Sequence, residues 1–180
     1  MHTKSTVVMG MSMPADLWKD CDVRIASTDG TTSFSVAPVG YQFSAAQKLS
    51  EDRNWLQVEL RVVLADGRQW EVVDPCLTTA EATSVSGWLA EAVRGTQPVA
   101  TELDIDERSA AVLSFLEPNF ALAVCAYPDA STLTLRVFLS YCDLASDAIY
   151  GTSVDITLTR TALAEAAAEW REQLVFFPPR

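Results

Sequence analysis

The sequence predicts an α+β fold in which a mainly antiparallel β-sheet of six to eight strands carries two principal helices. Two Asp-Gly turns between alternating apolar segments, and two segments with apolar residues at helical spacing, are the observations behind this prediction. The order is strands, helix, strands, helix with short connections, which is typical of α+β domains. The chain has 180 residues, of which 49% are hydrophobic. We therefore expect one domain over residues 1–180, with residues 1–20 loosely ordered.

The two Asp-Gly turns predict β-hairpins. Asp29-Gly30 separates "DVRIAST" from "TTSFSVA", and Asp66-Gly67 separates "NWLQVELRVVLA" from "RQWEVV". Asp-Gly is a strong hairpin signal at such places, because glycine adopts a positive φ at little cost. In the second hairpin apolar residues alternate with mostly polar ones, which predicts one buried and one largely exposed face.

Helices are predicted near residues 79–94 and 161–175. Thr78 and Glu81 have the spacing of a capping box before the first helix, and Gly95 is placed to end it. In the second helix apolar residues recur at spacings of four, three and four, and the prolines of "FFPPR" stop the helix. Its apolar stripe consists of Leu163, Ala167, Trp170 and Leu174.

The segments between the helices predict further strands. "STLTLRVFLS" (131–140) and "SVDITLT" (153–159) alternate, whereas both alternating sets of "NFALAVCAY" (119–127) are apolar. The last pattern predicts a central strand covered on both faces.

Two proline-containing segments interrupt the apolar pattern. Pro118 cannot donate to a sheet, so it is expected to break the apolar run into two strands, with Asn119 closing the corner through a side-chain bond to the backbone. Glu117 either caps a buried backbone group or is displayed at the strand end for a partner. Asp74 and Pro75 are expected to end the second hairpin.

The net charge of −11 is concentrated in the central part of the chain. Nine acids and two arginines lie between residues 95 and 159, a net charge of −7. Such a field repels nucleic acid and attracts basic partners, although acidity also serves solubility alone. We therefore expect a protein partner and no binding to nucleic acid.

The sequence lacks the residue patterns of a catalytic centre. Its one histidine is His2, and it has no phosphate-binding, nucleophile-elbow or metalloprotease motif. Cys76 precedes a predicted helix N-terminus, where the dipole can lower a thiol pKa, but without a base we expect it to be buried and inert. We therefore expect no enzyme and no cofactor. We also expect no metal and no disulfide, because the cysteines are scattered without the spacing of a metal site or a disulfide framework: Cys21, Cys76, Cys125 and Cys142.

The cellular compartment is predicted from two kinds of segment that the sequence lacks. No apolar stretch approaches the roughly 20 residues that span a bilayer, and the first 20 residues make a poor secretory signal. We expect a cytoplasmic protein with no membrane partner.

Several motifs occur in a recognisable order. They are "GYQF" (40–43), "DRNWLQVELRV" (52–62), "VVDPCLTTAE" (72–81), "WL" (88–89), "LSFLEPNFAL" (113–122) and "FFPPR" (176–180). Residues 38–180 thereby resemble the WapI-like immunity proteins and their uncharacterised relatives in bacterial genomes, and residues 1–37 match nothing in that pattern. The resemblance implies a cytoplasmic protein that neutralises the toxic C-terminal domain of a contact-delivered toxin, a nuclease in the named case.

Three functions are therefore compared. The first is immunity by binding and occluding a toxin domain, the second is an acidic binding module for another protein or small ligand, and the third is an enzyme. A toxin that binds phosphates through basic residues fits an acidic inhibitor. The residues expected to bind it lie in turn-like or strand-end segments: Asp104, Asp106, Glu107, Glu117 and Asp129.

Overall fold

The computed structural model describes residues 23–43, 52–100, 111–140 and 151–180, and the stretch predicted to be loosely ordered lies outside them. Within these ranges the fold contains two α-helices and eight antiparallel strands, which confirms the α+β prediction. The eight strands form two four-stranded sheets, in the orders β1-β2-β3-β4 and β5-β6-β7-β8. The elements are β1 (Val23–Ala26), β2 (Ser33–Tyr41), β3 (Trp55–Val63), β4 (Gln69–Thr78), α1 (Thr79–Arg94), β5 (Val112–Leu113), β6 (Phe120–Ala126), β7 (Thr132–Leu139), β8 (Thr152–Thr159) and α2 (Arg160–Leu174).

The same architecture occurs twice, although the sequence contains no internal repeat. Each half is a four-stranded meander whose last strand passes directly into a helix. Thr78 and Thr159 make these junctions, since each has extended backbone angles and accepts a hydrogen bond from an amide of the first helical turn. An N-cap residue is extended, so a strand can lead into a helix without a loop.

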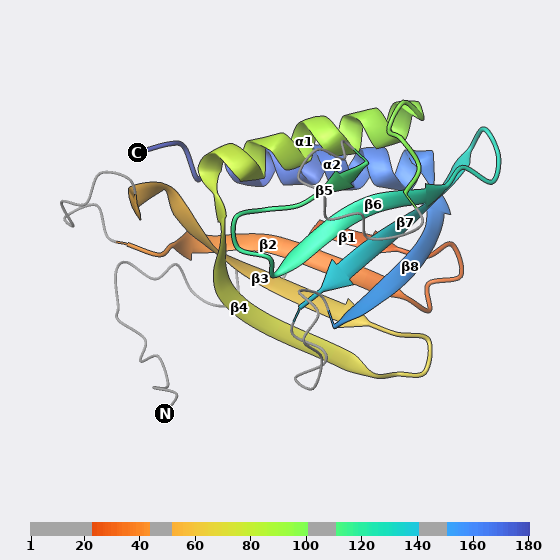
Figure 1. The fold of residues 1–180 in the computed structure, drawn as a ribbon, viewed down its shortest axis with the longest axis horizontal. Coiled ribbons are helices and arrows are strands. Elements are labelled where there is room, and N and C mark those ends of the chain that lie inside the picture. The colour runs from red at the N-terminus through yellow and green to blue at the C-terminus, as the bar shows by residue number, and fades with distance from the viewer. Residues whose placement is uncertain (1–22, 44–51, 101–110, 141–150) are drawn as a thin grey trace.

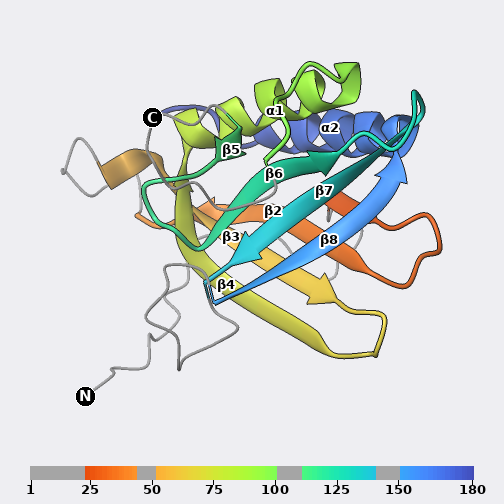
Figure 2. The same cartoon turned by 45° about the vertical axis from the view of Figure 1, so that its right-hand side comes forward.

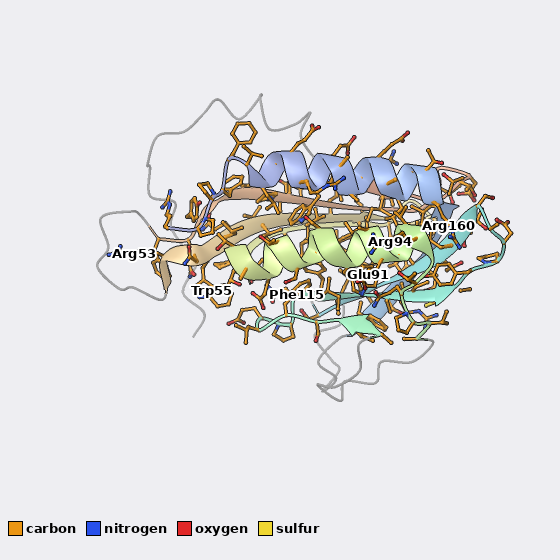
Figure 3. The ribbon with its side chains drawn as sticks, turned by 90° about the horizontal axis from the view of Figure 1, so that it is seen from above. Arg53, Trp55, Glu91, Arg94, Phe115 and Arg160 are labelled. Atoms are coloured by element: carbon orange, nitrogen blue, oxygen red, sulfur yellow. The ribbon has the colours of Figure 1, made fainter. Side chains whose placement is uncertain are left out.

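The two helices lie side by side over the two sheets (Figures 1 and 2). A backbone hydrogen bond of 2.9 Å from Thr28 to Thr157 links the first sheet to the second where β1 approaches β8. Arg160, the first residue of α2, reaches the C-terminal end of α1 (Figure 3), where its Nη1 donates to the carbonyl of Val93 at 3.4 Å. A cation at this end of a helix complements the exposed carbonyls.

One apolar core joins both sheets and both helices. The rings of Phe34 and Phe120 lie 5.8 Å apart and come from different sheets. Trp170 of α2 is fully buried, and its indole N–H donates to the carbonyl of Ala82 in α1 at 2.8 Å. Within the described residues, no helix is long and apolar enough to cross a membrane.

The local predictions are confirmed. Gly30 and Gly67 have positive φ in the two hairpin turns, at 72° and 84°, and Gly95 ends α1 in the left-handed conformation. The observed helices agree with the predicted ranges to within one residue, and α2 ends at Leu174, before the two prolines. Strand β6 lies between β5 and β7, and its first five residues are buried, as its apolar pattern predicted.

The prediction that Asp74 and Pro75 end the second hairpin is wrong. Strand β4 continues to Thr78, and Pro75 lies opposite Gln57 beside a register shift in the pairing of β3 with β4. Because β4 is the edge strand of its sheet, proline can occupy it without breaking a central ladder.

Candidate interaction surface

Two of the sequence motifs, far apart along the chain, contact each other near the N-terminal end of α1. The Nδ2 of Asn119 donates to Oδ2 of Asp74 at 3.2 Å. The amide of Leu116 donates to Oε1 of Glu81 at 2.8 Å. These bonds join "VVDPCLTTAE", at the end of the first sheet, to "LSFLEPNFAL", at the start of the second.

Glu81 uses both of its carboxylate oxygens. Its Oε2 accepts hydrogen bonds from the backbone amide and the hydroxyl of Thr78, each at 2.8 Å. The Thr78 hydroxyl in turn accepts from the amide of Glu81 at 3.2 Å, which completes the predicted capping box. The other oxygen, Oε1, holds Leu116. The capping residue of α1 therefore also positions the segment between β5 and β6.

The segment of residues 116–118 is held from both sides. Before it, Phe115 is buried and its ring lies 4.8 Å from that of Phe120; Figure 3 shows Phe115 beside α1, on the side away from α2. After it, the amide of Asn119 donates to the carbonyl of Glu117 at 2.8 Å. The Asn119 carbonyl accepts from the amide and hydroxyl of Ser140, both at 3.1 Å.

The role expected for Asn119 needs a correction. Its side chain bonds to the carboxylate of Asp74 and also to the thiol of Cys76, whereas the backbone of Asn119 closes the corner. The physical reason is that the Asn119 side chain is buried beside the Asp74 carboxylate and the Cys76 thiol of β4. Buried polar groups require hydrogen-bond partners, whereas the exposed turn can bond to water.

The held segment exposes an apolar side chain next to a carboxylate. Leu116 is 75% exposed, and Glu117 and Pro118 are also exposed. Among the residues that the structure describes, none makes a hydrogen bond or ion pair with the Glu117 carboxylate. Of the two roles considered for Glu117, capping a buried backbone group is not the one that its exposed side chain has among the described residues, because Glu81 accepts the neighbouring backbone amide instead. Display for a partner stays a prediction.

The pKa of the buried Cys76 thiol depends on the charged side chains near the N-terminal end of α1. This pKa is raised to about 12, mainly by desolvation and then by the carboxylates of Asp74, Glu81 and Glu117, against the lowering effect of the Asn119 hydrogen bond. A thiol with this pKa is protonated and unreactive at neutral pH, so the helix dipole does not activate it. The expectation that Cys76 is buried is confirmed.

We predict that Cys76 makes the protein less stable in alkali. Folding raises the pKa of the thiol from 9.0 to about 12, so the folded state holds the proton more tightly than the unfolded chain does. This stabilisation is complete below about pH 9 and is lost between about pH 9 and 12, by up to about 1.4 kcal/mol per pH unit. Urea denaturation of the parent and of Cys76→Ala at several pH values should therefore give slopes that differ in this window, and parallel slopes would contradict the assignment.

Of the other predicted residues, the structure describes only Asp129. Asp104, Asp106 and Glu107 lie outside the described residues. Asp129 is exposed at the opposite end of β6 from Glu117, and its carboxylate accepts hydrogen bonds from Ser131 and Thr132. These bonds lower the pKa of Asp129 to about 2. The carboxylate of Asp129 is therefore used within its own turn.

Sequence reasoning missed the exposed Leu116 and the anchoring role of Glu81. The Glu-Pro pair indicated a break after Leu116, but it carried no information on which way this side chain points. The contact between Leu116 and Glu81 spans 35 positions, so no local pattern could indicate it.

A hollow of about 550 Å³ lies between the β3–β4 turn and the start of β8. It is open to solvent, polar and apolar residues both line it, and its Asp66 is paired with Arg68 at 2.7 Å. It is not the closed apolar pocket that would favour a small ligand. In the part of the chain that the structure describes, no three His, Cys, Asp or Glu side chains are grouped to hold a metal ion.

Comparison with known proteins gives one match to a protein family. The family described as "Immunity protein WapI-like family" matches residues 24–178, which include both motifs that meet at α1. No curated protein matches this chain significantly. Among solved structures, the plant transcriptional regulator PBF-2 matches with 16% identity and a TM-score of 0.45, over 87% of this chain and 82% of that one.

Proposed function

This chain belongs to the WapI-like family of immunity proteins, and from that premise we propose that it binds a toxin domain and blocks it by occlusion, without turnover. The toxin proposed is the basic C-terminal domain of a contact-delivered protein, a nuclease, and the site of action is the cytoplasm. The family match over residues 24–178 is the observation that carries this proposal.

Charge supports the proposal independently of the family. The chain has a net charge of −11, and a nuclease binds phosphates through lysine and arginine. Complementary charge speeds the encounter of two proteins, which is valuable to an inhibitor that must act before damage occurs. The protonated state of Cys76 also fits a protein that acts by binding alone, since this was the one nucleophile suggested by the sequence.

The proposal is tested by co-expression with the C-terminal domain of a toxin encoded beside this gene. Cells that produce the toxin domain alone should stop growing, and cells that also produce this protein should grow. The two purified chains should form a stable complex. Growth arrest in the presence of abundant, folded protein would contradict the proposal.

We predict that Asp104, Asp106 and Glu107, the acidic segment, contribute to binding of the toxin. Reversing Asp104, Asp106 and Glu107 to lysine together should slow association and reduce its dependence on salt. The sequence predicts that these side chains are exposed, and exposed charges act mainly on the association rate. Binding kinetics at two salt concentrations measure this effect, with folding checked by circular dichroism. Unchanged protection by the folded triple variant would place the interface elsewhere.

A matched control separates local from overall charge. Glu165, Glu169 and Glu172 are exposed on one face of α2, and reversing them changes the net charge by the same amount. If both triple variants slow association equally, only the overall charge matters, and the prediction for the acidic segment is wrong.

A further inference from the structure

We propose that residues 116–118, the display turn, anchor the interface with the toxin, and that the partner surface is an apolar pocket for Leu116 with a basic side chain beside it for Glu117. This inference rests on the proposed function and adds the surface and the chemistry of the partner. Three features of the display turn carry it: its exposure, its rigidity and its charge.

Exposure alone does not identify an interface, because single exposed apolar side chains are common on protein surfaces. Leu116 is 75% exposed, and Phe176, just after α2, is 75% exposed as well. The two differ in what surrounds them. Phe176 lies between two apolar residues, Val175 and Phe177, whereas Leu116 is followed by the exposed carboxylate of Glu117 and its own amide is bound by Glu81.

The anchors fix the display turn in one position. Phe115 inserts into the core immediately before Leu116, and Glu81 accepts the amide of Leu116 itself at 2.8 Å. Asn119, immediately after Pro118, is buried and bonded to Asp74 and Ser140. Most of the ordering of this segment therefore occurs during folding, so little conformational entropy remains to be lost on binding. Side chains that carry binding energy are typically found on such rigid supports.

The charge around Leu116 specifies the partner. The side chain of Glu117 is exposed, and its carboxylate makes no hydrogen bond or ion pair with any other described residue. Asp74 and Glu81 lie close enough for all three carboxylates to act on the Cys76 thiol. An approaching surface must bury Leu116 and meet this negative field. Lysine or arginine at the rim of an apolar pocket satisfies both requirements, which is the charge expected of a phosphate-binding toxin.

The test compares Leu116→Ala, Glu117→Gln and Phe176→Ala for binding to a catalytically inactivated toxin domain. Leu116→Ala should weaken binding at least tenfold, mainly through faster dissociation and with unchanged salt dependence. Glu117→Gln should weaken binding several-fold at low salt and less at high salt. Phe176→Ala, the control of equal exposure, should bind like the parent. Circular dichroism should show all three folded, since each altered side chain is exposed.

The outcomes separate this inference from the proposed function. If the parent binds and folded Leu116→Ala binds within twofold of it, the display turn is not the anchor. If the parent does not bind the toxin domain, the proposed function fails and the inference fails with it. The parent is expected to be monomeric at binding concentrations by light scattering. A parent dimer that Leu116→Ala dissociates would show that the occupant is a second copy of this chain, which also overturns the inference.

Discussion

Replacing Trp170 with alanine is expected to lower the free energy of unfolding by about 3–5 kcal/mol, the usual cost of removing a large aromatic side chain from a core. Trp170 is fully buried, and it belongs to the same region of the core as residues of both sheets and of α1, among them Ile25, Phe120 and Leu89. Its indole N–H also bonds to Ala82 at 2.8 Å. The loss therefore affects both helices and both sheets at once.

Urea denaturation of the purified variants measures this prediction. Trp170→Phe keeps most of the apolar contact but loses the hydrogen bond to Ala82, so its loss of stability should be smaller, about 1–2 kcal/mol. The control is Trp70→Ala, because Trp70 is only partly buried, at the rim of the open hollow. The assignment of Trp170 to the shared core is wrong if Trp170→Ala costs less than Trp70→Ala. Trp170→Phe keeps the test valid if the alanine variant does not fold.

Much of the fold could be predicted because its signals are local. The hairpin turns depend on glycine with positive φ at Gly30 and Gly67, and α1 begins at a capping box whose residues lie three positions apart. Each of these features depends on residues only a few positions apart, so the sequence alone is enough to predict it. The buried pattern of β6 could be predicted for the same reason.

The remaining features depend on contacts between distant segments. Whether Pro75 ends a strand depends on its position at a sheet edge, and this depends on the order of strands in the sheet. Likewise, the side chain of Asn119 bonds to Asp74, which lies 45 positions earlier in the sequence. This contact forms because β4 and the start of β6 lie together in the fold. The candidate site consists mainly of such contacts. Glu117 could be named from the sequence as a candidate residue, whereas the exposed Leu116 and the contact that Glu81 makes with it could not.

Glu81 gives the second large prediction, because one carboxylate stabilises two distant segments. Glu81→Ala should lower the free energy of unfolding by about 1–3.5 kcal/mol, the sum of two contributions. Loss of a helix cap typically costs about 0.5–2 kcal/mol. The hydrogen bond to Leu116 is near the surface and contributes about 0.5–1.5 kcal/mol more. Urea denaturation measures the sum, and a loss below about 0.5 kcal/mol would contradict both contributions.

Glu81→Gln separates the two roles, because an amide has one acceptor oxygen where the carboxylate uses two. Glutamine serves in capping boxes, so its oxygen should stay with Thr78 and its NH₂ group should face the amide of Leu116, which is also a donor. Hydrogen exchange should therefore show protection of the Thr78 amide in Glu81→Gln but loss of protection at Leu116. Glu81→Ala should lose protection at both amides. Retained protection of Leu116 in Glu81→Gln would mean that the display turn is held without Glu81.

The same variants connect stability to binding. Glu81 is expected to act on the toxin mainly by positioning Leu116. At high salt, where the charge removed by Glu81→Gln is screened, this substitution should therefore weaken binding in the parent but have little further effect in a Leu116→Ala background. A double-mutant cycle measures this coupling directly. Additive effects would show that Glu81 and Leu116 contribute separately, in which case the rigidity of the display turn does not contribute to affinity.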